Sequence, residues 1–141
     1  MFRIYTQRDA NNTLQEVRRK FNDVLSQKKY VVELHEELQK TIEYNYNLEQ
    51  FVLKKQQLNA AVSELYKSIE TLESMGIVIK SVEEGLVDFP CKRFDEEVWL
   101  CWKIGENEIK FWHAKEEGFM GRKPLPQRGF SGEVDDFSDL K

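Results

Sequence analysis

The sequence predicts an α+β protein in which a long antiparallel helical hairpin precedes a four-stranded antiparallel β-meander and an acidic tail. Three observations predict this class. Residues 1–75 contain no Gly or Pro, and apolar residues recur there every three or four positions. After Gly76 the apolar period falls to two, which is typical of strands. The connections between the short apolar runs are brief, as they are between neighbouring antiparallel strands.

The helical half begins at Thr6, which is expected to cap the first helix, with Asp9 in its first turn. Two seams with alternating spacings of three and four residues predict coiled-coil-like packing. The first seam is Val17, Phe21, Val24, Lys28, Val31, His35, Leu38 and Ile42, and the second is Leu48, Phe51, Lys55, Leu58, Val62, Leu65, Ile69 and Leu72. His35 and Lys55 are expected to face each other as a polar layer that fixes the register.

A turn between the two helices is predicted at residues 43–47, because this stretch contains two Asn residues that suit a turn. Gly76 is expected to end the second helix. The alternative is one continuous helix in a dimeric coiled coil. The hairpin is favoured because the Tyr-Asn-Tyr-Asn stretch is weakly helical and because a hairpin buries both seams without a partner.

The predicted organisation is a single α+β domain over residues 1–125, followed by an acidic tail. Within the domain we expect the helical hairpin at 7–75, the β-meander at 77–114 and an irregular covering segment at 115–125. Residues 126–141 are expected to be disordered, because the last ten residues carry four acidic side chains and one Lys.

The faces of the sheet depend on how its last two strands pair. If Ile104 lies opposite Ile109, Leu100 lies opposite His113, and the apolar residues share one face that packs on the hairpin. That face would hold Val98, Leu100, Trp102, Ile104, Ile109 and Phe111, while the outer face would hold Trp99, Cys101, Lys103, Lys110 and Trp112. Asp88 would point to the outer face beside Cys101 or Trp99.

Two large aromatic side chains, Trp99 and Trp112, are unusual on the polar face of a sheet and indicate an interaction surface. The alternative is that the chain covers them itself. In that case Phe119, Met120 and Leu125 pack on the two rings, and Arg122 pairs with Asp88.

The composition excludes several classes of protein. A formal net charge of −4, with one run of three basic residues at 18–20 and otherwise only pairs such as 28–29, predicts no nucleic-acid binding. No apolar run is long enough to span a membrane, and no secretory signal is expected. Cys91 and Cys101 are expected to stay reduced, which favours a cytoplasmic location.

Four stretches together resemble one protein family: GLVDFP at 85–90, WLCW at 99–102, FWH at 111–113 and GFMGRKPL at 118–125. The chain is similar over about residues 4–125 to an uncharacterised prokaryotic domain-of-unknown-function family, the 2203 family. The resemblance implies a small cytoplasmic bacterial or archaeal protein of α+β type. It implies no activity, substrate or cofactor, so no catalytic residue is carried over.

The leading functional hypothesis is a non-enzymatic interaction or scaffolding module that uses the outer sheet face. The predicted surface consists of Trp99, Trp112, Asp88 and Arg122. The partner would be another protein or a second copy of the chain, which gives a homodimer. No complete catalytic constellation and no cofactor are predicted, so the sequence favours a protein that is not an enzyme.

The alternative is a protein that binds a small anion or a divalent metal ion, with or without enzymatic activity. His113 would form a polar cluster with Asp88, Cys101 and Arg122 at one end of the sheet. Asp88, His113 and Glu116 offer metal ligands, and Arg122 offers a bidentate anion contact. The predicted register weighs against this site because it puts His113 and Asp88 on opposite faces. A nucleophilic Cys101 would need His113 as its base, and the predicted register separates these two residues as well.

Overall fold

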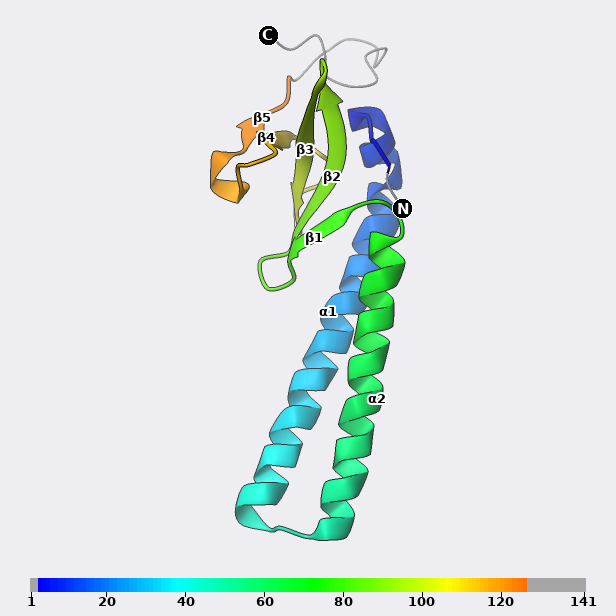
Figure 1. Cartoon of the computed structure of the whole chain (residues 1–141), viewed down its shortest axis with the longest axis vertical. Helices are drawn as coiled ribbons and strands as arrows, with labels where there is room; N and C mark the ends of the chain where they lie inside the picture. Colours follow the sequence, from blue (N-terminus) through cyan, green and yellow to red (C-terminus); the bar gives the residue numbers. More distant parts are fainter. Residues whose placement is uncertain (1–2, 127–141) are drawn as a thin grey trace. The chain divides into compact units, whose positions relative to one another are not determined.

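A computed structural model describes residues 3–126 and contains helices and an antiparallel sheet (Figure 1). The chain divides into two compact units, residues 19–71 and residues 3–18 with 72–126, and each is described by itself. The fold class is α+β as the sequence predicts, but the sheet has five strands rather than four. The single domain over 1–125 stays a prediction. The tail at 126–141 lies outside the described residues, except for Pro126.

The unit of residues 19–71 is an antiparallel pair of helices (Figure 1). It contains most of α1 (Gln7–Tyr44) and of α2 (Leu48–Glu73). The helices are separated by residues 45–47, as predicted. Asn47 caps α2, because its side-chain Oδ1 accepts a hydrogen bond of 3.0 Å from the backbone N–H of Gln50.

The buried row of this unit follows the first predicted seam at Phe21, Val24 and Leu38 but departs from the predicted seams elsewhere. The predicted seam residues Ile42 and Leu48, next to the turn, are exposed. Leu34 is buried and His35 is exposed, while Ala61 is buried and Val62 is only half-buried. Lys55 is also exposed, so the predicted polar layer of His35 and Lys55 is wrong. Leu34 and His35 follow Val31 by three and four residues, so both fit the spacing of a helical stripe, and the apolar side chain is the one that is buried.

The unit of residues 3–18 and 72–126 begins with the first three turns of α1. The backbone N–H of Asp9 donates a hydrogen bond of 2.9 Å to Thr6 Oγ1, which confirms the predicted cap. Before the helix, the backbone N–H of Tyr5 donates to the Pro90 carbonyl at 2.6 Å, and the Tyr5 ring meets Phe89 edge-on at 5.1 Å. The apolar side chains of these turns are buried, namely Ala10, Leu14 and Val17.

The start of α1 also holds the connection that precedes β4. Asn11 Oδ1 accepts a hydrogen bond of 2.6 Å from the backbone N–H of Ile109, and Gln7 Nε2 donates to the Ile109 carbonyl at 3.3 Å. Arg18 donates to the carbonyls of Glu106 and Asn107. Residues nearly one hundred positions apart therefore fix where the fourth strand begins.

The sheet is a meander in which each strand pairs antiparallel with the next along the chain (Figure 1). Its strands are β1 (Val78–Ser81), β2 (Leu86–Arg93), β3 (Glu96–Lys103), β4 (Phe111–Ala114) and β5 (Lys123–Pro124). Gly76 precedes β1 with a φ of +87°, the left-handed conformation expected after the end of α2.

The pairing of β3 with β4 is shifted by one residue from the predicted register. Trp99 lies opposite His113 and Leu100 lies opposite Trp112, whereas the prediction paired Leu100 with His113. Ile109 is not part of β4 but a buried residue of the preceding connection, held by α1. Because side chains alternate along a strand, this shift exchanges the faces of every β4 residue.

The two faces of the sheet follow from this register. The inner face is apolar and buried, and it consists of Val87, Phe89, Cys91, Val98, Leu100, Trp102 and Trp112. The opposite face, which we call the site face, carries Asp88, Pro90, Trp99, Cys101, Phe111 and His113. Trp99 and Trp112 therefore lie on opposite faces, and the prediction that they share the outer face is wrong.

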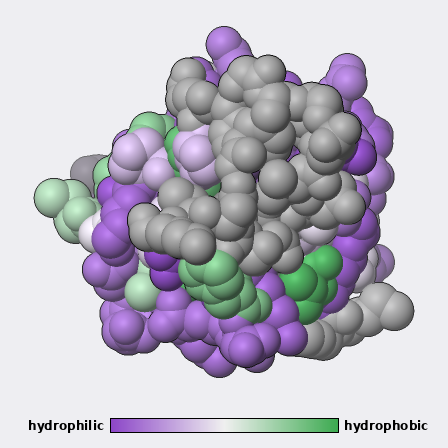
Figure 2. All heavy atoms as spheres, turned by 90° about the horizontal axis from the view of Figure 1, so that it is seen from above, coloured by the Kyte–Doolittle hydropathy of each residue, from purple (hydrophilic) through white to green (hydrophobic). Residues whose placement is uncertain are grey.

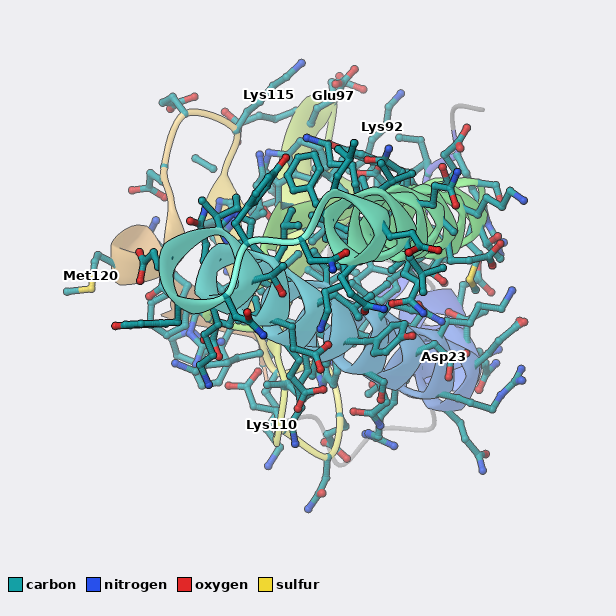
Figure 3. The ribbon with its side chains drawn as sticks, turned by 90° about the horizontal axis from the view of Figure 1, so that it is seen from below. Asp23, Lys92, Glu97, Lys110, Lys115 and Met120 are labelled. Atoms are coloured by element: carbon teal, nitrogen blue, oxygen red, sulfur yellow. The ribbon has the colours of Figure 1, made fainter. Side chains whose placement is uncertain are left out.

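The segment 115–125, predicted to be irregular, contains a short 3-10 helix, η1 (Phe119–Gly121), and β5. Phe119 packs on the guanidinium of Arg122, which also lies over the Phe111 ring of the site face. Met120 is 94% exposed and projects outward (Figure 3). The segment therefore covers part of the site face, but not through the predicted contacts of Met120 with the two tryptophans.

The face of the molecule seen in Figure 2 is mostly polar where its residues are described. In the view of Figure 2, hydrophilic residues dominate and hydrophobic side chains form small separate patches. Neither of the described helices is long and apolar enough to cross a membrane.

Gly85 is the glycine whose replacement should cost most. Its φ is +70°, and an added Cβ would lie 2.9 Å from Ile104 Cβ and closer still to Ile104 Cγ2. We expect Gly85→Ala to lower the free energy of unfolding by about 2–4 kcal/mol, because strain and overpacking add. Urea denaturation measures this. Gly118→Ala is the control, since nothing lies within 4 Å of its added Cβ; equal losses in both variants would contradict the account.

Candidate metal centre

A buried pair of side chains, Asp88 and His113, lies at the centre of the site face. His113 Nε2 is 3.0 Å from Asp88 Oδ2, and the side chains are 2% and 1% exposed, respectively. Asp88 comes from β2 and His113 from β4, and Cys101 of β3 stands between them in the sheet. The predicted position of Asp88 beside Cys101 is confirmed, whereas the predicted separation of Asp88 from His113 is wrong.

The second ring nitrogen of His113 settles which nitrogen carries the proton. His113 Nδ1 lies 2.9 Å from the backbone carbonyl of Ala114. A carbonyl oxygen only accepts hydrogen bonds, so Nδ1 is the protonated nitrogen. In the neutral ring Nε2 then has a lone pair that faces Asp88.

Asp88 is held in an environment that disfavours its charged form. Burial raises the pKa of this carboxyl, and the nearby His113 and Lys80 only partly oppose that effect. Oδ2 is the oxygen that shares a hydrogen bond with His113 Nε2. The other oxygen, Oδ1, is buried and has no partner of good hydrogen-bond geometry among the described residues, although the neighbouring Cys101 thiol lowers the pKa of the carboxyl. A buried polar atom without a partner is costly and calls for an explanation.

Cys101 adds a third donor atom to the pair. Its side chain is buried opposite Asp88, and its Sγ lies 4.0 Å from Arg122 Nη1. Burial, with a contribution from the neighbouring Asp88, raises the pKa of this thiol to about 12. Cys101 is therefore a protonated thiol near neutral pH. Although His113 lies on the same face, contrary to the prediction, the thiol is not activated as a nucleophile.

The three side chains have the composition and spacing of a metal site. One ligand atom from each of Asp88, Cys101 and His113 lies within 4.8 Å of the other two. In a tetrahedral zinc site, bond lengths of about 2.0–2.3 Å place neighbouring ligand atoms roughly 3.3–3.7 Å apart. The ligand atoms of the three side chains would have to move by a few tenths of an ångström to about 1 Å to reach that geometry.

A cavity of about 110 Å³ adjoins these three side chains. Lys80 of β1 and the segment that leads into η1 line its other walls, with Glu117 and Phe119 among them. The volume is enough for a few water molecules or one small ligand.

Arg122 is engaged with Glu106 and not with Asp88 as predicted. Its Nη2 lies 2.6 Å from Glu106 Oε2 and its Nη1 lies 3.2 Å from Glu106 Oε1. The guanidinium also stacks on Phe111 and Phe119. Glu106 accepts a further hydrogen bond from the backbone N–H of Lys103. This bidentate pair fixes η1 over the site face, and the guanidinium edge that would hold a small anion is already occupied.

Glu116, the remaining predicted ligand, is exposed and is not part of the cluster. Its neighbour Glu117 lines the cavity instead. Glu117 Oε1 accepts hydrogen bonds from Lys123 Nζ and from the backbone N–H of Ala114, and these bonds, the first above all, lower the pKa of this carboxyl. Sequence reasoning placed the acid one residue away, because the turn after β4 was not predicted.

The predicted interaction surface of Trp99, Trp112, Asp88 and Arg122 is not one continuous surface. Trp112 lies on the inner face and Asp88 is buried, while Trp99 is half-buried on the site face. Lys80 Nζ lies 4.8 Å from the centre of the Trp99 ring. The two tryptophans therefore cannot meet one partner together on a single face.

Comparison with known proteins identifies the family of this chain. A family model described as an uncharacterized conserved protein (DUF2203) matches residues 3–125. The chain belongs to this family, and the resemblance seen in its sequence motifs is confirmed. No curated protein and no solved structure matches the chain.

Replacing Asp88 by Asn tests whether this carboxyl serves the fold. Because the folded-state pKa of Asp88 is raised, its contribution to stability is present below the unfolded pKa, near 4, and is lost as pH rises through the folded pKa. In metal-free protein we expect the stability of the native chain to fall relative to Asp88→Asn above pH 4, by at most about 1.4 kcal/mol per pH unit.

Thermal unfolding between pH 4 and pH 8 measures this difference. Asp23→Asn is the matched control, since Asp23 is exposed on α1 (Figure 3). An Asp88→Asn variant that becomes less stable than the native chain as pH rises would show that the ionised carboxyl supports the fold.

Proposed function

We propose that this DUF2203 protein binds one divalent transition-metal ion of the zinc type through Asp88, Cys101 and His113. The observation that carries the proposal is the convergence of a carboxyl, a thiol and an imidazole from three neighbouring strands in one buried place. Rigid strands hold such ligands more accurately than loops do.

The mixture of donor atoms supports a zinc-type ion over the hard cations. Ca²⁺ and Mg²⁺ are bound through oxygen, whereas thiolate and imidazole ligands suit Zn²⁺ and its neighbours in the first transition series. A dication with one thiolate and one carboxylate forms a neutral group. Burial of that group costs less than burial of a separate charge.

The hydrogen bonds around the cluster also support a bound cation. The backbone carbonyl of Ala114 accepts the proton of His113 Nδ1, which is how protein metal sites commonly orient a histidine ligand. The lone pair of Nε2 then points into the cluster. A cation would also give Asp88 Oδ1 the partner that it lacks among the described residues.

Three protein ligands leave a fourth position of a tetrahedral ion open, as in zinc sites that bind a water or a substrate. In this chain that position would face the cavity lined by Lys80 and Glu117. The cavity limits the fourth ligand to water or a small molecule.

Calorimetric titration of chelator-treated protein with Zn²⁺ tests the proposal. We expect one equivalent to bind, and Cys101→Ser or His113→Gln to weaken binding at least about 100-fold, because each removes a ligand of the metal. Mg²⁺ should not compete. Cys91→Ser is the matched control, because Cys91 is also buried but lies on the inner face.

The proposal fails if native protein takes up no Zn²⁺. It also fails if Cys101→Ser binds Zn²⁺ as tightly as Cys91→Ser does. Circular dichroism of each metal-free variant confirms that a loss of binding is not a loss of the fold.

A second candidate function is self-association through the end of the helical hairpin. Large apolar side chains are exposed there, including Tyr44 at 80% and Leu48 at 65%. Val52 and Leu53 extend this patch along α2. If two α2 helices pack antiparallel about Val52, Glu49 lies opposite Lys55 of the second copy on both sides, which makes the surface self-complementary in charge.

Sedimentation equilibrium measures this association. We expect a dimer for the native chain and a monomer for Val52→Lys, because a charge at the centre of an apolar interface is costly. Val32→Lys, at a similarly exposed position of α1, should remain dimeric. A native chain that is monomeric at about 100 μM would rule out an association of ordinary strength.

We also propose a cytoplasmic location. Cys91 and Cys101 form no disulfide. Thiols stay reduced most readily in a reducing compartment, which supports this location.

A further inference from the structure

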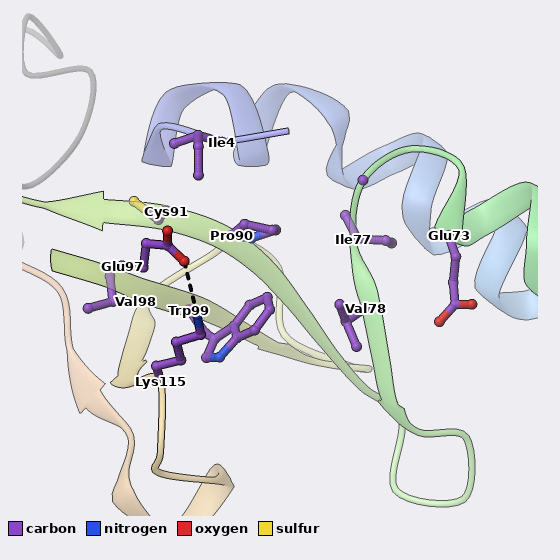
Figure 4. Close-up of a pocket in the computed structure, with 11 residues that line it drawn as sticks. Ile4, Glu73, Ile77, Val78, Pro90, Cys91, Glu97, Val98, Trp99 and Lys115 are labelled. Atoms are coloured by element: carbon purple, nitrogen blue, oxygen red, sulfur yellow. Dashed lines mark hydrogen bonds and ion pairs between the residues drawn. The ribbon is translucent and has the colours of Figure 1, made fainter. Parts of the chain in front are cut away.

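A second cavity, of about 230 Å³, lies where the end of α2 meets the sheet edge (Figure 4). It is distinct from the proposed metal site, since none of Asp88, Cys101 and His113 lines it. Trp99 projects from β3 toward Val78 of β1 and forms one wall (Figure 4). The other apolar walls come from Ile4, Ile77, Pro90 and Val98.

The size and lining of this cavity suit the apolar part of a small organic molecule. An engineered apolar cavity of about 150 Å³ in another protein binds benzene, so 230 Å³ accommodates one ring with a short chain. The half-buried indole of Trp99 offers a flat surface for stacking. The proline ring of Pro90, which is paired with Trp99 across the strands, adds to that surface.

The charges at this cavity favour a cation. Lining residues include two carboxylates, of which Glu97 is paired with Lys115 at 3.1 Å. Figure 4 draws this ion pair beside the Trp99 ring and shows Glu73 beyond Ile77 and Val78. Among the described residues no cation pairs with Glu73, so the residues that line the cavity carry one net negative charge. Outside the lining, Lys80 Nζ lies 4.8 Å from the centre of the Trp99 ring and does not pair with Glu73.

The end of α2 adds to this negative potential. Glu73 is the last residue of a helix of 26 residues, and the last turn of that helix contains no basic residue. A helix C-terminus carries a partial negative charge and favours cations, so an acid at this position is disfavoured unless something compensates it. A bound ammonium group would compensate both the carboxylate and the helix end.

We propose that this cavity binds a small organic amine, with its apolar body against Trp99 and its ammonium group at Glu73. The ligand class is a primary amine attached to one ring or a short aliphatic chain. The site goes beyond the proposed metal-binding function and does not require a metal ion.

Titration of the full chain with 2-phenylethylamine, followed by NMR of the backbone amides and indole N–H groups, tests the proposal. We expect saturable shifts at Trp99 and Val78, and binding at least about fivefold tighter than that of the neutral analogue 2-phenylethanol, because only the amine compensates Glu73. The anionic analogue 3-phenylpropionate should bind more weakly than both.

Glu73→Gln should weaken amine binding about fivefold and leave alcohol binding unchanged. Glu70→Gln, which removes a neighbouring exposed carboxylate of α2, is the matched control and should bind the amine as the native chain does. Equal affinities for amine and alcohol, amine binding unaffected by Glu73→Gln, or no shift at Trp99 would each overturn the proposal. Zn²⁺ titration of Glu73→Gln separates the two sites, since its metal binding should equal that of the native chain.

Discussion

The pairing of Trp99 with His113 is the constraint on which the site depends. It turns the imidazole to the face that carries Asp88 and Cys101, and it turns the Trp112 indole to the buried inner face. A shift of one residue would reverse both outcomes. The register is held from outside the sheet, because Asn11 and Gln7 of α1 bind the backbone of Ile109 just before β4. The first turns of the first helix therefore decide the chemistry of the fourth strand.

The buried cluster of Asp88, Cys101 and His113 places polar side chains where a stable core ordinarily has apolar ones. Asp88 combines a raised pKa with an oxygen that lacks a partner among the described residues, although an apolar residue at this position would suit the sheet better. Around it the contacts are well satisfied: Arg122 and Glu106 form a bidentate pair, and Glu117 closes the turn after β4. Buried polar groups that lack partners, within surroundings whose own hydrogen bonds are satisfied, are typical of functional sites.

The sequence predicts the elements of this fold better than their tertiary register. The cap at Thr6 and the turn that contains Asn47 depend on residues within a few positions, so local patterns find them. The apolar alternation from Ile109 to Phe111 resembles a strand that starts at Ile109, and only the distant Asn11 shows that it does not. The burial of Leu34 in place of His35 is likewise a choice between two neighbours that both fit the helical spacing.

In the candidate site, too, features that depend on neighbouring residues could be predicted, whereas those that depend on distant contacts could not. Asp88 and His113 stand out in the sequence as polar residues within apolar strands, and Asp88 is correctly placed beside Cys101. Their convergence could not be predicted, because it needs the register that α1 imposes. Nor could the engagement of Arg122 with Glu106, which requires the fifth strand to bring residues 119–122 back over Phe111.

Taken together, these contacts support the proposed metal site on one face of the sheet. The most direct test is X-ray absorption fine structure at the zinc edge of protein loaded with one equivalent of Zn²⁺. The account predicts one sulfur neighbour at about 2.3 Å, with the remaining neighbours being nitrogen and oxygen at about 2.0–2.2 Å. A spectrum with oxygen and nitrogen neighbours alone would place the ion elsewhere and contradict the assignment of Cys101 as a ligand.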